Sequence, residues 1–351
     1  MLAQSHSPKQ LSPQELDAYL ARGWFRMGQT IFTTNFVHFK NEMYSTIWLR
    51  VLLNEYLPDR TQIKLYKQNS IFQAAIQPAV INSEKEELYF RYQQSLSFQT
   101  SESLQQLLFG KITIPSIYDT YEVTVHDGNQ LIACGFFDVG ESCAAGITSI
   151  YDPAYKKYSL GKYLIYLKML YCQNKKLRYF YPGYFVPGYE FFDYKLTIGR
   201  PALQFLKLSS QQWQGIGIFS PDDIPRQVMN EKLISVQKLL VHSYLESSIV
   251  KYEYFDANLI PDFRDSELFD FPIFLFCPSH LEEGFHLTIV YDVRVANYKL
   301  LLCLPIWQPD TTNADTSFYS CYYLKVMQEI VIKSTAEEIV TFFLALIKDK
   351  T

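Results

Sequence analysis

The sequence predicts an α+β fold with a mixed sheet flanked by helices, and residues 131–201 carry most of that prediction. Residues 131–137 and 144–151 are apolar segments joined by a short polar turn, a pattern typical of two paired strands. In residues 160–171 leucines recur at three- and four-residue steps, which indicates a helix. Residues 178–186 then return as an aromatic strand. Because the helix lies between two strands, we expect it to form a right-handed crossover within one sheet.

The segments that precede this region carry several local signals. Residues 12–15 form a capping box with proline at the first helical position, which predicts a helix that ends at Gly23. Residues 43–56 alternate between apolar and polar side chains and fit either a strand or a helix. Residues 101–109 predict a short helix, and residues 126–129 (HDGN) predict a hairpin turn between two strands.

Beyond Pro201 the chain reads as a second set of helices and strands. The predicted elements are a helix at residues 230–247, strands at 273–277, 286–295, 298–307 and 317–332, and a closing helix at 336–348. A separate α+β module and an extension of the first sheet both fit this pattern.

Composition describes a globular protein with a sizeable core. The chain has 351 residues, of which 48% are hydrophobic and 19% charged, enough for two domains or one domain with an added module. No apolar run approaches the ~20 residues of a membrane span, and the polar N-terminus carries no signal-peptide pattern. We therefore expect a cytoplasmic protein without a membrane partner. The six cysteines include no C-x-x-C pair, so neither a zinc ribbon nor a disulfide framework is expected.

Residues 153–189 form a basic region in a chain whose formal net charge is −4. This window contains no Asp or Glu, and tyrosines are interleaved with its basic residues. The basic residues are Lys156, Lys157, Lys162, Lys168, Lys175, Lys176 and Arg178. A basic aromatic surface at a helix N-terminus suits phosphates and unstacked bases. A solvated helix face fits the same composition.

Five short motifs occur in order along this region: Tyr151-Asp152-Pro153, Ser159-Leu160-Gly161, Tyr181-Pro182-Gly183-Tyr184, Tyr194-Lys195 and Pro201. Together they resemble the pattern YDP…SLG…YYxGYY…YK…P of the C-terminal domain of arginyl-tRNA–protein transferases. Residues 16–32 (LDAYLARGWFRMGQTIF) are similar to the LLxRGWRRSGxxxY segment of the same family. The resemblance covers about residues 16–208 and does not extend to residues 209–351.

The resemblance implies an acetyltransferase-like (GNAT-type) fold that uses aminoacyl-tRNA in place of acetyl-coenzyme A. It also implies transfer of an amino acid, with arginine as the expected one, to the N-terminal amine of a protein that begins with Asp or Glu. This transfer creates a degradation signal. We accordingly expect an N-terminal region of the transferase (1–110), an acetyltransferase-like catalytic core (111–208) and a C-terminal α+β extension of unknown role (209–351).

The chain departs from this family in its cysteines. Family members usually carry a cysteine cluster near the N-terminus that can hold a metal or iron–sulfur cluster, whereas no cysteine precedes Cys134 here. We therefore expect no metal and no cofactor, with aminoacyl-tRNA as a co-substrate.

The implied reaction is attack of a protein α-amine on the ester that joins an amino acid to tRNA, so positioning and oxyanion stabilisation are the main tasks. By the resemblance, the candidate catalytic residues are Asp138 as base and Tyr181 and Tyr184, whose hydroxyls either donate to the oxyanion or line the aminoacyl pocket. The candidate residues for the tRNA and its aminoacyl group are Tyr151, Ser159, Leu160, Gly161, Lys162, Lys168 and Gly183. The candidate residues for the acceptor are Arg26, Tyr194, Lys195 and Arg200.

Each candidate also fits a purely structural role. Asp138 fits a turn cap, Ser159 an ordinary N-cap, and Lys195 or Arg200 a solvated surface, while the tyrosines fit core packing. Two other functions stay open. An acyl-coenzyme A-dependent N-acyltransferase would share the core, although the helix start Y-S-L-G-K-Y lacks the R/Q-x-x-G-x-G/A of acetyltransferases. An inactive relative that binds RNA or protein would share the basic region.

Overall fold

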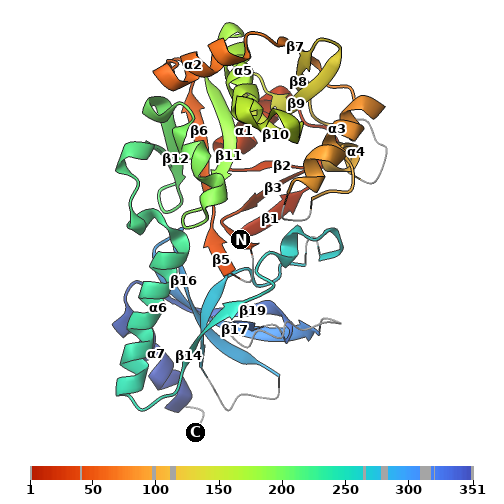
Figure 1. The fold of residues 1–351 in the computed structure, drawn as a ribbon. Coiled ribbons are helices and arrows are strands. Elements are labelled where there is room, and N and C mark those ends of the chain that lie inside the picture. Colours follow the sequence, from red (N-terminus) through yellow and green to blue (C-terminus); the bar gives the residue numbers. More distant parts are fainter. Residues whose placement is uncertain are drawn as a thin grey trace.

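Two large sheets lie one above the other along the molecule, and helices flank both of them (Figure 1). An eight-stranded and a six-stranded sheet are accompanied by a three-stranded and a two-stranded one. This arrangement confirms the α+β class, whereas the acetyltransferase type stays a prediction. The structure, a computed structural model, describes residues 2–39, 42–96, 100–110, 116–263, 266–277, 284–308, 318–319 and 321–348.

The eight-stranded sheet has the order β13-β12-β6-β11-β10-β9-β8-β7. Its strands are β6 (Ile47–Leu52), β7 (Gln73–Pro78), β8 (Thr120–Asp127), β9 (Gln130–Val139), β10 (Cys143–Tyr151), β11 (Tyr179–Phe185), β12 (Leu203–Lys207) and β13 (Gln212–Gly215). Strands β10 and β11 pair in parallel, and the other neighbours are antiparallel. Helix α5 (Leu160–Asn174) connects the parallel pair, so the predicted strand–helix–strand arrangement is confirmed.

Local signals near the N-terminus are confirmed as well. The capping box at residues 12–15 starts helix α1 (Pro13–Ala21), and Gly23 follows it with a φ of +77°. The turn at residues 126–129 joins β8 to β9. Residues 43–56, which fitted two readings, include strand β6, because β11 and β12 pair with it from either side.

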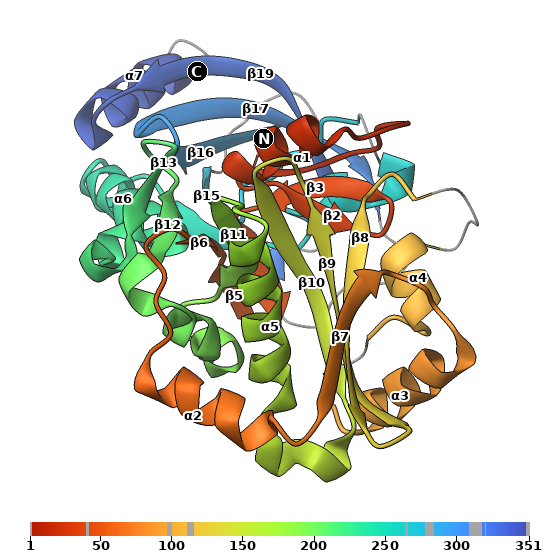
Figure 2. The same cartoon turned by 90° about the horizontal axis from the view of Figure 1, so that it is seen from above.

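Helices cover both faces of the eight-stranded sheet. They are α2 (Arg60–Asn69), α3 (Ser83–Gln94), α4 (Leu104–Phe109) and α5. α5 lies on one face, and α3 and α4 lie on the other (Figure 2). Alternation along β9 explains this layout: Phe137 is buried in a cluster with Leu164 of α5, whereas Phe136 is buried with Leu88 of α3. The strands at the centre of the sheet therefore have little contact with solvent.

The N-terminal residues connect the two large sheets. The strands concerned are β1 (Ala3–His6), β2 (Phe25–Met27) and β3 (Thr30–Thr34), in the order β1-β3-β2, and the pair β4 (Phe36–Phe39) and β5 (Glu42–Ser45). The Ala3 amide donates to the carboxylate of Asp270 over 3.2 Å. Leu2, Phe36 and Met43 are buried in the same apolar cluster as the C-terminal helices.

The C-terminal third forms a sheet of its own with the order β18-β14-β15-β16-β17-β19. The strands are β14 (Ser248–Tyr252), β15 (Ile273–Cys277), β16 (His286–Asp292), β17 (Asn297–Trp307), β18 (Phe318–Tyr319) and β19 (Tyr323–Lys333), and the helices are α6 (Pro225–His242) and α7 (Ala336–Lys348). The two helices pack together against this sheet and bury Leu233, Leu240, Ile339 and Phe343.

Short 3-10 helices complete the chain: η1 (Pro153–Tyr158), η2 (Glu190–Thr197), η3 (Arg200–Ala202), η4 (Ile216–Ile218), η5 (Pro221–Asp223), η6 (Ala257–Leu259) and η7 (Pro261–Phe263). The expected domain boundary after residue 110 adjoins residues 111–115, which lie outside the described residues. Strand β13 lies beyond the expected boundary at residue 208, yet it pairs with β12 in the first sheet. The division into domains stays a prediction. None of the helices in the described residues has both the length and the apolar character to cross a membrane.

Candidate active site

Strands β10 and β11 separate after a short paired stretch. They pair over three positions, of which the last joins Ala145 to Tyr181. The next residue on β11 is Pro182, which has no N–H to donate to a neighbouring strand. Gly183 follows with a φ of +88°, a left-handed conformation that favours glycine. The register of β10 against β9 also shifts just beyond this point, so the sheet opens here.

A cavity of about 620 Å³ occupies the opening. Its apolar and aromatic walls include Tyr89, Tyr92, Leu107, Ile147, Phe180 and Phe191. Its lysines are Lys156, Lys162, Lys168 and Lys195, and no Asp or Glu lines it among the described residues. The predicted site residues that line it are Tyr151, Ser159, Gly161, Lys162, Lys168, Tyr194 and Lys195. The structure therefore brings together half of the predicted set.

The start of α5 forms one edge of this cavity. Ser159 has a φ of +52° and makes no side-chain cap hydrogen bond, so the expected N-cap interaction is wrong. Leu160 is fully buried and anchors the first turn in the core, away from the cavity. Gly161 packs next to the ring of Tyr151, where a Cβ would lie 3.5 Å from the ring. The first N–H groups of an α-helix have no intrahelical partners, so those at the start of α5 are available to a ligand.

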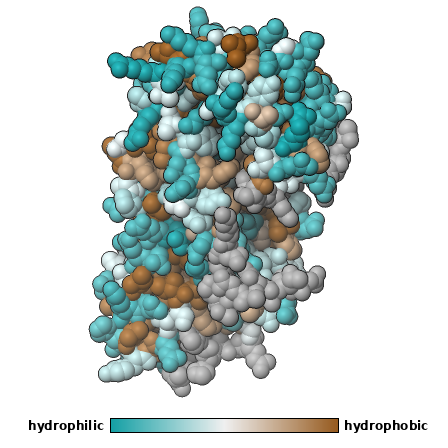
Figure 3. Space-filling view, in the orientation of Figure 1, coloured by the Kyte–Doolittle hydropathy of each residue, from teal (hydrophilic) through white to brown (hydrophobic). Residues whose placement is uncertain are grey.

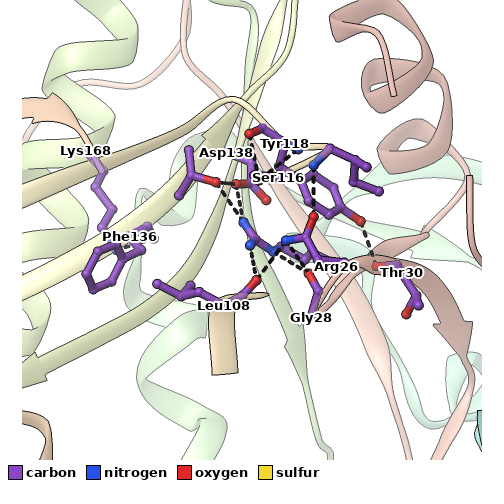
Figure 4. Close-up of polar contacts among 12 residues, drawn as sticks. Arg26, Gly28, Thr30, Leu108, Ser116, Tyr118, Phe136, Asp138 and Lys168 are labelled. Carbon is purple, nitrogen blue, oxygen red and sulfur yellow. Dashed lines mark hydrogen bonds and ion pairs between the residues drawn. The ribbon is translucent and has the colours of Figure 1, made fainter. Parts of the chain in front are cut away.

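Lys168 contradicts the expectation of a solvent-facing lysine surface. Its side chain is 1% exposed, and its Nζ donates to the carbonyls of Phe136 and Thr148, each at 2.9 Å, and to Ser149 Oγ at 3.1 Å. Figure 4 shows this side chain reaching towards Phe136. Burial lowers the pKa of Lys168 to about 7. Lys168 therefore belongs to the floor of the cavity and not to a tRNA-facing surface, whereas Lys156 and Lys162 are exposed.

Lys195 also lines the cavity and belongs to η2. Its Nζ donates to the Tyr184 carbonyl over 2.8 Å and lies 5.1 Å from the Phe192 ring centroid, within cation–π range. Burial lowers the pKa of Lys195 to about 7. The Nζ also approaches Gly183, where a Cβ would lie 3.1 Å away. A glycine at position 183 therefore leaves the room that this ammonium needs.

Asp138 and Arg26 form a buried ion pair away from the cavity (Figure 4). Arg26 Nη1 donates to Asp138 Oδ1 over 2.7 Å, and the Thr120 hydroxyl donates to the same oxygen over 2.7 Å. The guanidinium also donates to the carbonyls of Leu108 and Gly28. Burial raises the pKa of Asp138, and the Arg26 charge opposes that rise. A base and an acceptor ligand must both meet substrate, so neither residue suits the role expected from the sequence.

The two candidate oxyanion donors are packing residues in this structure. Tyr181 is 1% exposed, with its ring edge against Phe25 and Trp213, and burial raises its pKa. Tyr184 packs edge-on against Trp48, with ring centroids 5.0 Å apart. Neither tyrosine lines the cavity. Arg200 does not line it either and faces a second cavity on the other side of α5.

Several wall residues have no counterpart among the sequence candidates. Tyr89 and Tyr92 come from α3, Leu107 comes from α4, and Phe191 comes from η2. Helical periodicity places such side chains on one face of a helix, but it does not identify the opening that they face. Within the described part of the chain, no three His, Cys, Asp or Glu side chains gather as a metal site would require.

Comparison with known families gives one matching profile. The family described as "Arginine-tRNA-protein transferase, C terminus" matches residues 84–203. That stretch contains α3, α4, the separated strands, α5 and η2, and hence most of the cavity.

Curated relatives match over a similar share of the chain. The "Aspartate/glutamate leucyltransferase" of Leptospira interrogans serogroup Icterohaemorrhagiae serovar copenhageni is 30% identical over 192 residues, 54% of this chain and 73% of that protein. The protein of the same name from Campylobacter jejuni (strain RM1221) is 25% identical over 188 residues, 52% and 77% of the two chains. That of Vibrio cholerae serotype O1 (strain ATCC 39541) is 24% identical over 212 residues, 59% and 86%. These names do not confirm arginine as the transferred amino acid.

Two solved structures are distantly similar. L-PGS from Bacillus licheniformis has a TM-score of 0.30 at 10% identity, with coverage of 50% of this chain and 51% of that one. A C-terminal domain (DUF2156) from Agrobacterium fabrum has a TM-score of 0.31 at 13% identity, with coverage of 50% and 53%. This chain spans about half of each, and the likeness is too weak to bear on fold or function.

Proposed function

This chain belongs to the arginine-tRNA-protein transferase family of aminoacyltransferase enzymes, and on that premise we propose that it transfers leucine from leucyl-tRNA to the N-terminal amine of proteins that begin with Asp or Glu. The observation that carries this proposal is the cavity between β10 and β11. It combines aromatic and apolar walls with lysines, and no carboxylate lines it among the described residues. The names of the three relatives support both the leucine and the acidic acceptor.

The walls of the cavity suit an apolar donor side chain better than an arginine. A buried guanidinium needs acceptors for its five N–H donors, above all a carboxylate, and is costly to bury without them. A leucyl side chain needs only apolar contact, and its burial contributes about 1.5–3 kcal/mol. Tyr89, Leu107, Ile147 and Phe180 supply such contact. The volume of about 620 Å³ accommodates an aminoacyl group with room for the attacking amine.

The lysines suit the acceptor. A protein that begins with Asp or Glu brings a carboxylate close to the attacking amine, and a lysine ammonium binds a carboxylate through a charge-assisted hydrogen bond. Lys195 is the best placed, because its Nζ in the protonated form carries three donors, of which the Tyr184 carbonyl uses one among the described residues, and a bound carboxylate favours that form. Lys156 and Lys162 are exposed at the edge of the same cavity and add positive charge there.

The chemistry makes modest demands on these residues. The amine nitrogen forms a bond to the ester carbonyl carbon, the bond from that carbon to the ribose oxygen breaks, and the ribose hydroxyl gains the proton that the amine loses. An α-amine has a pKa of about 8, so a useful fraction is neutral near pH 7 without a strong base. The cavity then acts by holding the ester and the amine together and excluding bulk water.

The test is a transfer assay with two donors and two acceptors. Purified protein is incubated with tRNA charged with labelled leucine or labelled arginine, and with peptides that begin with Asp or Ala. We expect label only in the Asp peptide, and only from leucyl-tRNA. Label from arginyl-tRNA would overturn the choice of leucine, and absence of label from both donors would overturn the transfer activity.

A single substitution tests the acceptor side. Lys195→Met removes the proposed carboxylate ligand, so kcat/KM for the Asp peptide should fall by about 10- to 100-fold, the range of a hydrogen bond to a charged group. The KM for leucyl-tRNA should not change. Lys157→Met is the matched control, because Lys157 is exposed nearby and does not line the cavity. Equal losses in the two variants would remove Lys195 from acceptor binding.

A further inference from the structure

A second cavity lies on the other side of the first turn of α5. Its volume is about 570 Å³, and its walls come from α2, α5 and the segment at residues 197–200. The side chains that matter for its chemistry are Lys64, Lys162, Arg200, Thr61, Ser159 and Asp59. About half of its lining residues belong to α2 and the residue before it, which contain none of the site residues predicted from the sequence.

The charges in this cavity favour an anion. Lys64, Lys162 and Arg200 are exposed, and none of them forms an ion pair within the part of the chain that the structure describes. The single carboxylate in the lining, Asp59, is occupied at the start of α2, where its Oδ1 accepts the Gln62 amide over 2.8 Å. The surface over α2, at the top of Figure 3, is dominated by hydrophilic side chains. The cavity therefore presents cations and hydroxyls to a ligand from solvent.

The two cavities share an edge. Ser159 and Lys162 line both of them, so the first turn of α5 separates a cavity with aromatic and apolar walls from one whose walls are mainly polar and basic. A molecule whose apolar end fills the first cavity can continue past Lys162 into the second. The part that enters the second must carry negative charge at short intervals to use all three cations, as a chain of phosphodiesters does.

We propose that the second cavity binds the phosphodiesters of the single-stranded 3′ end of the donor tRNA, with Lys64 and Arg200 as ligands and Lys162 at the junction. This inference rests on the proposed function, which places the aminoacyl group of the same tRNA in the first cavity. It moves Arg200 from the acceptor, where sequence reasoning had placed it, to the donor. Guanidinium and ammonium groups together suit this task, because arginine binds phosphate oxygens in pairs and lysine binds them as a point charge.

The experiment measures binding to the full chain of a leucyl-tRNA analogue in which a stable amide replaces the ester. The measurement is repeated at several salt concentrations. Each phosphate contact contributes about 0.7 to the slope of log affinity against log salt for a single strand. The double variant Lys64→Gln, Arg200→Gln should therefore lose about 1.4 from that slope and bind about 10- to 100-fold more weakly at low salt. Lys67→Gln is the matched control, since Lys67 is an exposed lysine of α2 outside the cavity. Circular dichroism checks that all variants are folded.

The outcomes separate this inference from the proposed function. If the unaltered protein does not bind the charged tRNA, the proposed function fails. If it binds and the double variant keeps the same affinity and slope, the second cavity is not the phosphate site, while the proposed function stands. Coenzyme A and inorganic phosphate are added as competing probes. In one outcome, coenzyme A binds the unaltered protein as tightly as the tRNA does and binds the double variant much more weakly. This result would assign the cavity to a coenzyme and overturn the proposal. Failure of both probes to compete at millimolar concentration would support it.

Discussion

Lys168 gives the sharpest prediction, because its buried position makes its contribution to the free energy of unfolding depend on pH. The ammonium is buried beside the cavity, and the three groups that accept its hydrogen bonds are two carbonyls and the Ser149 hydroxyl. No carboxylate among the described residues pairs with it. Desolvation therefore acts without a compensating charge, and it lowers the pKa of Lys168 from 10.5 to about 7.

The sign follows from proton uptake. Between about pH 7 and the unfolded-state pKa near 10.5, the unfolded chain holds one more proton at this side chain than the folded chain does. The free energy of unfolding therefore rises with pH through this window, by about 1.4 kcal/mol per pH unit. Below about pH 7 both states are protonated, and the whole penalty for burying the charge is present, on the order of 5 kcal/mol. Above the unfolded-state pKa the penalty is absent.

Lys168→Met removes this pH dependence and leaves the shape of the side chain nearly unchanged. The free energy of unfolding is measured by urea denaturation at several pH values from about 7.5 to about 9.5, and the variant is subtracted from the unaltered protein. The difference should change by about 2.7 kcal/mol across the window, in favour of the unaltered protein at high pH. The absolute stability of the variant depends also on the Phe136 and Thr148 carbonyls, which lose a donor, so the slope is the informative quantity.

Subtraction removes the contribution of every other titrating group, including Lys195, whose pKa is lowered to a similar value. Lys175→Met serves as a control on the same helix, because Lys175 is exposed at the end of α5. Its curve should run parallel to that of the unaltered protein. Parallel curves for Lys168→Met would refute the reasoning, since they would mean that Lys168 keeps the pKa of a solvated lysine.

Two further substitutions test the packing around the site, each by urea denaturation. Asp138→Asn leaves a buried guanidinium without its charge partner and should lower the free energy of unfolding by about 3–5 kcal/mol, whereas the exposed neighbour Asp119→Asn should change it by less than about 0.5 kcal/mol. Gly23→Ala should cost about 1–2 kcal/mol or more, because φ is +77° and the new Cβ would lie 2.8 Å from Leu206 Cδ2. Gly217→Ala, with open space around it, is the control, and similar losses in both variants would contradict the steric reasoning.

Elements that depend on neighbours in sequence were predictable. The capping box before α1, the hairpin turn at residues 126–129 and the leucine period of α5 act over a few residues, and each appears where the pattern indicated. Strand β6 was not predictable, because its partners β11 and β12 lie more than a hundred residues further along the chain. Its alternating pattern alone did not distinguish it from a helix.

The burial of Lys168 could have been predicted from its position on the helix, although a count of basic residues does not show it. Leu160, Leu164 and Lys168 follow each other at four-residue steps, so helical geometry puts them on one face, and both leucines are fully buried. Lys162 lies two residues after Leu160 and faces solvent. Counting lysines in a window treats both as surface charges, whereas their angular positions on the helix separate them.

Asp138 was misread for a different reason. It stands near a glycine-containing turn, yet β9 continues through it to Val139, and its neighbour across the sheet is Thr120. The partner that fixes its role is Arg26, which arrives from a separate small sheet more than a hundred positions earlier. Pairing at that separation leaves no mark on the sequence around either residue.

The residues that line the cavity fall into two groups, those within the motifs that resemble the family and those outside them. Tyr151, Gly161 and Lys195 belong to the motifs that resemble the family, and they line the part of the cavity next to the separated strands and α5. Tyr89, Tyr92 and Leu107 belong to α3 and α4, outside those motifs, and they form the wall on the opposite face of the sheet from α5.

Residues that bind the ester and the amine must suit every aminoacyl-tRNA, because the reacting groups are the same whichever amino acid is carried. Only the wall that meets the amino-acid side chain discriminates, and its energy scale is that of apolar burial or of an unpaired charge. Under the proposed function a wall of tyrosine and leucine accepts a leucyl group, whereas it supplies no carboxylate to pair with a guanidinium. Under the proposed function, part of the wall that selects the amino acid comes from α3 and α4, which lie outside the motifs.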